Sequence, residues 1–83
     1  MSSEEILTRV TEIVAEALTL RPDEVNVDAP LSKQKNPADD LDVIEIVMTV
    51  EHAYQIEIRD DEIGDLTVRK LSDIVIKRKQ VSK

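Results

Sequence analysis

The sequence predicts an all-α protein, a small four-helix bundle with three longer helices and one short one. Apolar residues recur at spacings of three and four in three stretches of the chain, which is typical of amphipathic helices. Of the 83 residues, 35% are charged, one is Gly and only Tyr54 is aromatic, which favours helices packed through aliphatic side chains over a β-sandwich. We expect one domain spanning residues 1–83.

The first predicted helix runs over residues 3–20. Ser3 is the expected N-cap, with Glu4 and Glu5 near the positive end of the helix dipole. A proline at position 22 ends the pattern, because it disfavours helical geometry in the residue before it, and residues 22–25 could form one short turn. The apolar residues at helical spacing are Ile6, Leu7, Val10, Ile13, Val14, Ala17 and Leu18.

Residues 26–38 are predicted to be a loop. It contains the helix breakers Asp28, Pro30, Asn36 and Pro37. A loop of this length in a small domain is either functional or held down by apolar residues. The expected anchors to the core are Val27, Ala29 and Leu31.

The second predicted helix runs over residues 40–54, with Asp39 or Asp40 as its N-cap. It is apolar over more than half its circumference, so it is either buried on two sides or keeps an exposed apolar stripe for a partner. We expect burial for most of these residues. Leu41, Ile44, Val47 and Met48 share one side of the helix, and Ile46, Val50 and Tyr54 share another.

The last third of the chain predicts an extended link, a short helix and a final long helix. Residues 56–58 alternate like a strand but have no partner strand, so we expect an extended link. Residues 60–66 predict a short helix ending near Gly64, and Thr67 can cap a helix over residues 68–79. Lys77, Arg78 and Lys79 would lie at its negative end.

Charge is unevenly distributed along the chain. The net charge of −7 argues against nucleic acid as a partner. Residues 39–65 carry ten acidic residues and one Arg, which leaves −9, whereas residues 66–83 carry six basic residues and one Asp, which leaves +5. Such an acidic segment would attract a basic partner surface, although a solvated helix surface is an equally good interpretation of composition alone.

Several kinds of chemistry lack the residues they need. Without Cys there can be no disulfide, thiol nucleophile or Cys metal site, and one Gly cannot make a phosphate-binding loop. His52, the one histidine, is expected to be a solvent-facing helix residue, so we expect no catalytic residue and no metal site. No stretch approaches the ~20 apolar residues of a membrane span, and the acidic N-terminus lacks a signal-peptide pattern. These features predict a cytoplasmic protein.

The region from residue 38 to residue 62 resembles the acyl carrier protein family. The resemblance implies a helical bundle that shuttles acyl chains on a 4′-phosphopantetheine arm and docks partner enzymes through its second helix. The matching residues are Ala38-Asp39, Leu41-Asp42, Glu45-Ile46-Val47-Met48, Val50-Glu51, Tyr54 where the family usually has Phe, Ile56-Glu57-Ile58 and Asp60-Asp61-Glu62.

The chain departs from the family pattern at its most important position. The family has an Asp-Ser-Leu triplet whose serine hydroxyl carries the arm, and here Asp40 stands in place of the serine. An ionised carboxylate only accepts hydrogen bonds, and its attack on coenzyme A would give a labile acyl phosphate. We therefore expect no covalent cofactor. Asp40 could be only a helix cap, or a cap that also mimics the phosphate charge. Arg59 replaces a proline, and residues 33–37 are basic and polar where the family is often acidic.

The sequence thus predicts a non-enzymatic, monomeric docking protein of fatty-acid or related acyl metabolism that binds basic enzyme surfaces without inserting into membranes. Alternatives are a conventional carrier whose serine was altered and a helical interaction module outside acyl metabolism. A free acyl chain bound in the aliphatic core is a further possibility. The residues expected to contact partners are Asp39, Asp42, Glu45, Glu51 and Asp60.

Overall fold

The computed structural model describes residues 2–81, apart from the side chains of residues 60, 80 and 81. The elements are α1 (Ser3–Leu18), η1 (Pro22–Glu24), η2 (Leu31–Lys33), α2 (Asp40–Tyr54), η3 (Asp60–Glu62) and α3 (Val68–Val81). The prediction of an all-α fold is confirmed, since the β pairing within residues 2–81 amounts to one bridge between Pro30 and Thr67. The predicted short fourth helix is the single 3-10 turn η3.

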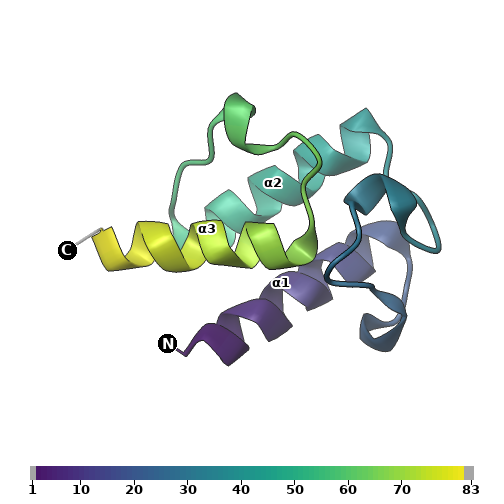
Figure 1. Cartoon of the computed structure of the whole chain (residues 1–83), viewed down its shortest axis with the longest axis horizontal. Helices are drawn as coiled ribbons and strands as arrows, with labels where there is room; N and C mark the ends of the chain where they lie inside the picture. The colour runs from purple at the N-terminus through teal and green to yellow at the C-terminus, as the bar shows by residue number, and fades with distance from the viewer. Residues whose placement is uncertain (1, 82–83) are drawn as a thin grey trace.

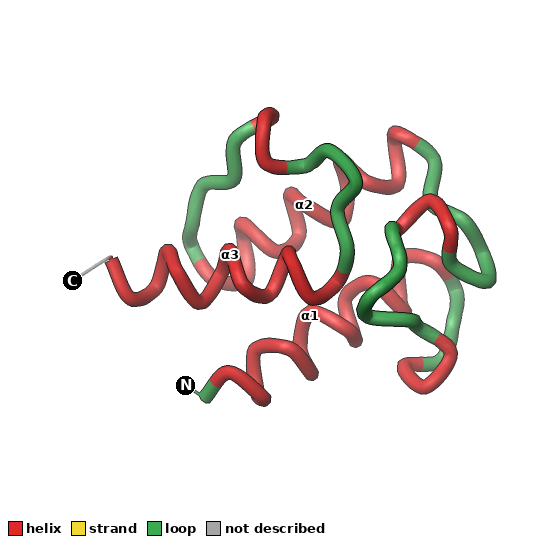
Figure 2. Tube along the Cα trace, in the orientation of Figure 1, coloured by secondary structure: helices red, strands yellow, loops and turns green. Residues whose placement is uncertain are grey.

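Over residues 2–81, three long helices are joined by two long connections, as can be followed in Figures 1 and 2. The beginning of α1 and the last turns of α3 lie at the same end of the molecule, and the α1–α2 connection folds over the opposite end. The connection that carries η3 runs from α2 back to the start of α3. Across residues 2–81, none of the helices combines the length and apolar character needed to cross a bilayer.

The core lies where α1 packs against both α2 and α3. It is built from branched aliphatic side chains, as the composition predicts, and Tyr54 is buried among them with 6% of its surface exposed. Burying such side chains is the main favourable contribution to folding. The fully buried large side chains are Val10, Val14, Leu31, Ile46, Val50, Val68, Leu71 and Val75.

The two ends of α1 differ from the prediction. Its N-cap is Ser2 rather than Ser3, and the Ser2 and Glu5 side chains bond to each other's backbone N–H in a capping box. The helix ends at Leu18 rather than Leu20, because Thr19 adopts a left-handed conformation (φ 57°). The N–H of Leu20 then bonds to the carbonyl of Ala15 at 2.8 Å, which closes the helix end.

The bounds of α2 agree with the prediction, and its N-cap is Asp39. The Asp39 carboxylate accepts a hydrogen bond from the N–H of Asp42 at 2.8 Å, and the Asp42 carboxylate accepts one from the N–H of Asp39 at 3.1 Å. This reciprocal capping box uses both carboxylates. Asp40, the other candidate cap, is the first helical residue and takes no part in the cap.

The polar run at residues 33–37 holds the α1–α2 connection together. The buried amide of Gln34 donates to the carbonyls of Asn26 and Ala29 at 2.8 and 3.0 Å and accepts from the N–H of Asn26 at 2.8 Å. Asn36 donates to the carbonyl of Leu18 at 3.0 Å. This departure from the family pattern therefore has a structural role. Leu31 is a buried anchor, as predicted, and Val27 and Ala29 are half-buried.

The α2–α3 connection is extended at residues 56–58, and within the described chain these residues form no strand, as predicted. The carboxylate of Glu51 accepts a hydrogen bond from the N–H of Ile58 at 2.8 Å. Thr67 caps α3 as predicted, accepting a bond from the N–H of Lys70 at 3.0 Å. The connection is thus tied to a long helix at both ends.

Candidate functional site

One face of α2 exposes large apolar side chains to solvent. Leu41, Ile44 and Met48 have exposed fractions of 64%, 47% and 54%, and their spacing places them along one side of the helix. The expectation of burial is right for most of the apolar residues predicted on the two sides of this helix, because Ile46, Val47, Val50 and Tyr54 are buried, and these three residues are the exceptions. We call Leu41, Ile44 and Met48 the apolar stripe. A contiguous exposed stripe of this kind marks an interaction surface.

Asp40 lies at the start of this stripe. Its side chain is exposed, and with the described residues its carboxylate makes neither a hydrogen bond nor an ion pair. It lines a hollow of 490 Å³ at the N-terminal end of α2, together with Ile44 and with Ile63 from the α2–α3 connection. The first turn of a helix favours a negative charge through its unpaired N–H groups. The fold therefore leaves this carboxylate free for a partner.

The same hollow is also lined by two residues that no sequence pattern indicates as part of a site. Ser32 comes from η2 and Asp65 from the turn after η3, and both are exposed. They lie 8 residues before and 25 residues after Asp40, so no sequence spacing indicates that they share its surroundings. The tertiary fold alone places a second carboxylate and a hydroxyl on this hollow.

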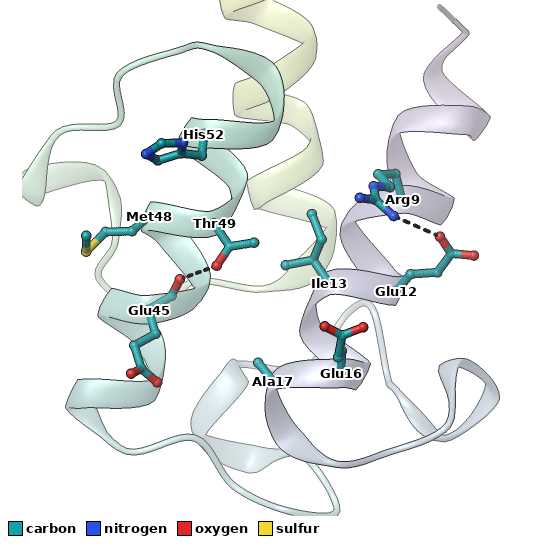
Figure 3. Close-up of a pocket in the computed structure, with 9 residues that line it drawn as sticks. All are labelled: Arg9, Glu12, Ile13, Glu16, Ala17, Glu45, Met48, Thr49 and His52. Atoms are coloured by element: carbon teal, nitrogen blue, oxygen red, sulfur yellow. Dashed lines mark hydrogen bonds and ion pairs between the residues drawn. The ribbon is translucent and has the colours of Figure 1, made fainter.

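A second hollow, of 640 Å³, lies between α1 and α2 (Figure 3). Thr49 of α2 and Ile13 of α1 point toward one another across it, whereas Met48 points away from α1. His52 lies on its α2 side and is exposed, as predicted. The apolar stripe thus runs between two hollows, with Ile44 beside one and Met48 beside the other.

The five acidic residues predicted to contact partners have different surroundings. Asp39 and Asp42 are engaged in the α2 capping box, and Glu51 is bonded to the N–H of Ile58. Glu45 is exposed on α2, and within the described residues its carboxylate has no partner. The side chain of Asp60 lies outside the described part of the structure. Glu45 and Asp40 are thus two carboxylates on α2 that have no partner among the described residues.

The turn η3 is fixed next to this face by Glu62. The Glu62 carboxylate accepts a hydrogen bond from the backbone N–H of Arg59 at 3.0 Å and pairs with the guanidinium of Arg78 on α3. These contacts, the backbone N–H first, lower the pKa of Glu62 below its ordinary 4.5. Because Ile63 follows directly, this bracing positions one wall of the hollow that Asp40 lines.

A phosphopantetheine arm is attached through a hydroxyl, whereas residue 40 is an aspartate. Four described residues offer a serine hydroxyl. Ser72 is buried and donates to the carbonyl of Arg69 at 2.9 Å, and Ser2 caps α1. Ser3 lies in the first turn of α1. Only Ser32 shares a hollow with Asp40.

Within the described residues, no three His, Asp or Glu side chains are grouped so as to hold a metal ion.

Comparison with known proteins identifies the family. Residues 8–75 match the family model described as "Phosphopantetheine attachment site". The chain is 44% identical over 61 residues to the acyl carrier protein of Prochlorococcus marinus strain MIT 9515, covering 74% of this chain and 75% of that protein. It is 37% identical over 76 residues to that of Thermosynechococcus vestitus, covering 90% and 93%.

A solved structure agrees with these sequence relatives. The fold resembles that of the acyl carrier protein from Enterococcus faecalis, with a TM-score of 0.76 and 25% identity, over 94% of this chain and 99% of that one. The family model covers more than half of the chain, and the helices superpose along nearly its whole length. The chain therefore belongs to the acyl carrier protein family, whose members are non-enzymatic carriers of acyl metabolism.

Proposed function

We propose that this family member docks onto enzymes of fatty-acid or related acyl metabolism without carrying a phosphopantetheine arm. The observation that carries the proposal is the exposed carboxylate of Asp40, which has no partner among the described residues and lies at the start of an exposed apolar stripe on α2. The stripe provides the surface a docking protein needs, whereas the carboxylate lacks the hydroxyl a carrier needs. We place this activity in the cytoplasm and assign it to the monomer.

The partner surface is apolar at its centre and basic around it. The apolar stripe supplies the central contact, and the free carboxylates of Asp40 and Glu45 supply charge at its edge. Asp39, Asp42, Glu51 and Asp60 add to the negative potential, three of them through carboxylates that also hold the fold together. Each exposed charge pair should contribute about 0.2–1 kcal/mol and should raise the association rate more than the affinity.

The chemistry of attachment supports an arm-free protein. A serine oxygen attacks the β-phosphate of coenzyme A, expels adenosine 3′,5′-bisphosphate and leaves a stable phosphodiester. A carboxylate attacking the same phosphorus would leave a mixed anhydride, which water hydrolyses. Asp40 could therefore hold an arm only transiently.

The test is incubation with a phosphopantetheinyl transferase, coenzyme A and Mg²⁺, followed by intact-protein mass spectrometry. We expect no gain in mass for the natural chain and a gain of one arm for Asp40→Ser. A gain on the natural chain would overturn the proposal. The Ser32→Ala variant would then show whether the hydroxyl beside Asp40 had been modified.

Docking is tested by pull-down of purified fatty-acid synthesis enzymes at low and high salt. We expect binding that weakens as salt rises, because exposed charges are screened. Ile44→Asp should abolish binding, since it places a charge in the centre of the stripe. Thr8→Asp, an equal change of charge at an exposed position of α1 outside both hollows, should not. Equal binding by all three proteins would show that the stripe is not the docking surface, whereas the absence of salt-sensitive binding by the natural chain would favour a helical module outside acyl metabolism.

A further inference from the structure

The carboxylate of Asp40 has no structural task among the described residues. The N-cap of α2 is Asp39, and the reciprocal bond comes from Asp42. Asp40 is exposed, and its carboxylate bonds to none of the described residues. A residue that served only as a helix cap would be bonded to a backbone N–H. Asp40 is therefore not the helix cap that both interpretations of it assumed, and its charge is available to a partner that covers α2.

Asp40 places a negative charge at the position where an arm-bearing carrier has the negative charge of its phosphodiester. A phosphodiester on a serine at this position would carry one negative charge at the N-terminal end of α2, beside Leu41 and Ile44. An ionised carboxylate carries the same charge at the same end of the same helix. A basic group on an enzyme surface that binds the arm's phosphate could thus bind the Asp40 carboxylate instead. The bound protein would present no thiol and no acyl group for transfer.

We propose that the protein is a dead-end competitor: it occupies the carrier-docking site of enzymes that use arm-bearing carriers, with the Asp40 carboxylate meeting the basic group that otherwise meets the arm's phosphate. The inference rests on the proposed docking function and adds its consequence. The partner is an enzyme surface on which Lys or Arg side chains surround an apolar depression. The protein binds there, excludes the loaded carrier and dissociates unchanged.

The hollow beside Asp40 favours this role over binding of a free fatty acid. Asp40 and Asp65 both line it, and both are exposed. Like charges repel, so the carboxylate of a fatty acid bound in this hollow would be disfavoured. A basic protein surface would instead be attracted, because both carboxylates carry the opposite charge.

The experiment measures malonyl transfer from malonyl-CoA to an ordinary serine-bearing carrier that holds its arm, catalysed by a malonyl-CoA:carrier transacylase. Initial rates are recorded against carrier concentration with increasing amounts of the natural chain. We expect the apparent KM for the carrier to rise in proportion to the added protein while kcat stays constant. We also expect the inhibition to weaken as salt rises.

Three variants sharpen the assay. Ile44→Asp should raise the inhibition constant about tenfold or more, because it disrupts the centre of the contact. Asp40→Asn keeps the shape of the side chain but removes its charge, and should raise the inhibition constant about three- to fivefold. Thr8→Asp is the control and should inhibit like the natural chain. Circular dichroism checks that each variant is folded.

Two results would overturn the competitor role. One is transfer unaffected by the natural chain even though the pull-down shows it bound to the transacylase, and this result would leave the docking function standing. The other is equal inhibition by the natural chain and by Asp40→Asn. The charge of Asp40 would then not take the place of the arm's phosphate in the contact with the enzyme. A gain of one arm in mass on the natural chain would instead contradict the proposed arm-free function, so the two failures are distinguishable.

Discussion

The carboxylate of Glu51 accepts a hydrogen bond from the backbone N–H of Ile58, at 2.8 Å and seven residues further along the chain. Between them the chain leaves α2 through Gln55, which has a left-handed conformation (φ 55°), and Ile58 is buried with 8% of its surface exposed. The bond thus fixes the direction in which the chain leaves α2. A residue predicted to contact partners also braces the fold.

We expect Glu51→Ala to lower the free energy of unfolding by about 1–2 kcal/mol, because it leaves the N–H of Ile58 without its acceptor. Urea denaturation of the natural chain and the variant measures the difference. Glu45→Ala removes a free carboxylate from the same helix and should change stability by no more than about 0.5 kcal/mol. Equal effects of the two substitutions would show that the Glu51 bond contributes nothing.

Substitutions of the adjacent residues Asp39 and Asp40 should differ in how much they lower the stability of the protein. Asp39→Ala removes the N-cap of α2 and should cost about 1 kcal/mol, within a range of about 0.5–2. Asp40→Ala removes only a charge near the helix N-terminus and should cost less. Thermal unfolding followed by circular dichroism at 222 nm compares them. A larger loss for Asp40→Ala would mean that Asp40 is the true cap.

Gln34→Ala should destabilise the α1–α2 connection. The substitution leaves the N–H of Asn26 and the carbonyl of Ala29 without their partner, while the carbonyl of Asn26 keeps only the N–H of Ala29 as a donor. We expect the free energy of unfolding to fall by about 1–3 kcal/mol in total. Hydrogen exchange should be faster at the amide of Asn26. Lys33→Ala, at an exposed position of the same run, is the control, and exchange equally fast in both variants would contradict a specific role for Gln34.

Two isoleucines of α2, two residues apart, should respond differently to truncation. Ile46 is completely buried, so Ile46→Ala should cost about 2–5 kcal/mol through lost burial and the cavity left behind. Ile44 is 47% exposed, so Ile44→Ala should cost about 1 kcal/mol or less. Urea denaturation measures both losses. Similar losses at the two positions would show that the stripe is covered in the free protein.

Stability should fall in acid partly through Glu62. Its pKa is lowered in the folded protein by the N–H of Arg59 and by Arg78, so the folded state holds the proton less tightly than the unfolded state does. This stabilisation is complete above the ordinary value of 4.5 and is lost as the pH falls through the lowered pKa. We expect the urea concentration at the midpoint of unfolding to decrease as the pH falls below about 4.5.

The Glu62→Gln variant tests that assignment. Glutamine does not titrate, so the urea midpoint should fall less steeply with decreasing pH than it does in the natural chain. Glu57→Gln is the matched control, because the Glu57 side chain is exposed and, within the described residues, its carboxylate has no partner. A pH profile of Glu62→Gln that is parallel to that of the natural chain would locate the acid sensitivity elsewhere.

The sequence predicts local features of this protein well. The spacing of apolar residues predicts three long helices, and the bounds of α2 and its cap agree with the structure because a cap and its partner are three residues apart. The end of α1 was predicted less well, since Thr19 adopts a left-handed conformation that its residue type does not indicate. The resemblance in residues 38–62 also predicts the family, which the comparisons confirm.

The helices, the aliphatic core, the acidic middle of the chain and the carboxylate at position 40 can all be read from the amino-acid sequence. The burial of Ile46 and the exposure of Ile44 cannot, because the two residues are equally apolar and their burial depends on where α1 lies. The tertiary structure also brought Asp65 to the hollow of Asp40 and tied Glu51 to Ile58. Periodicity reports which side chains share a helix face, but whether that face is covered depends on contacts between distant segments.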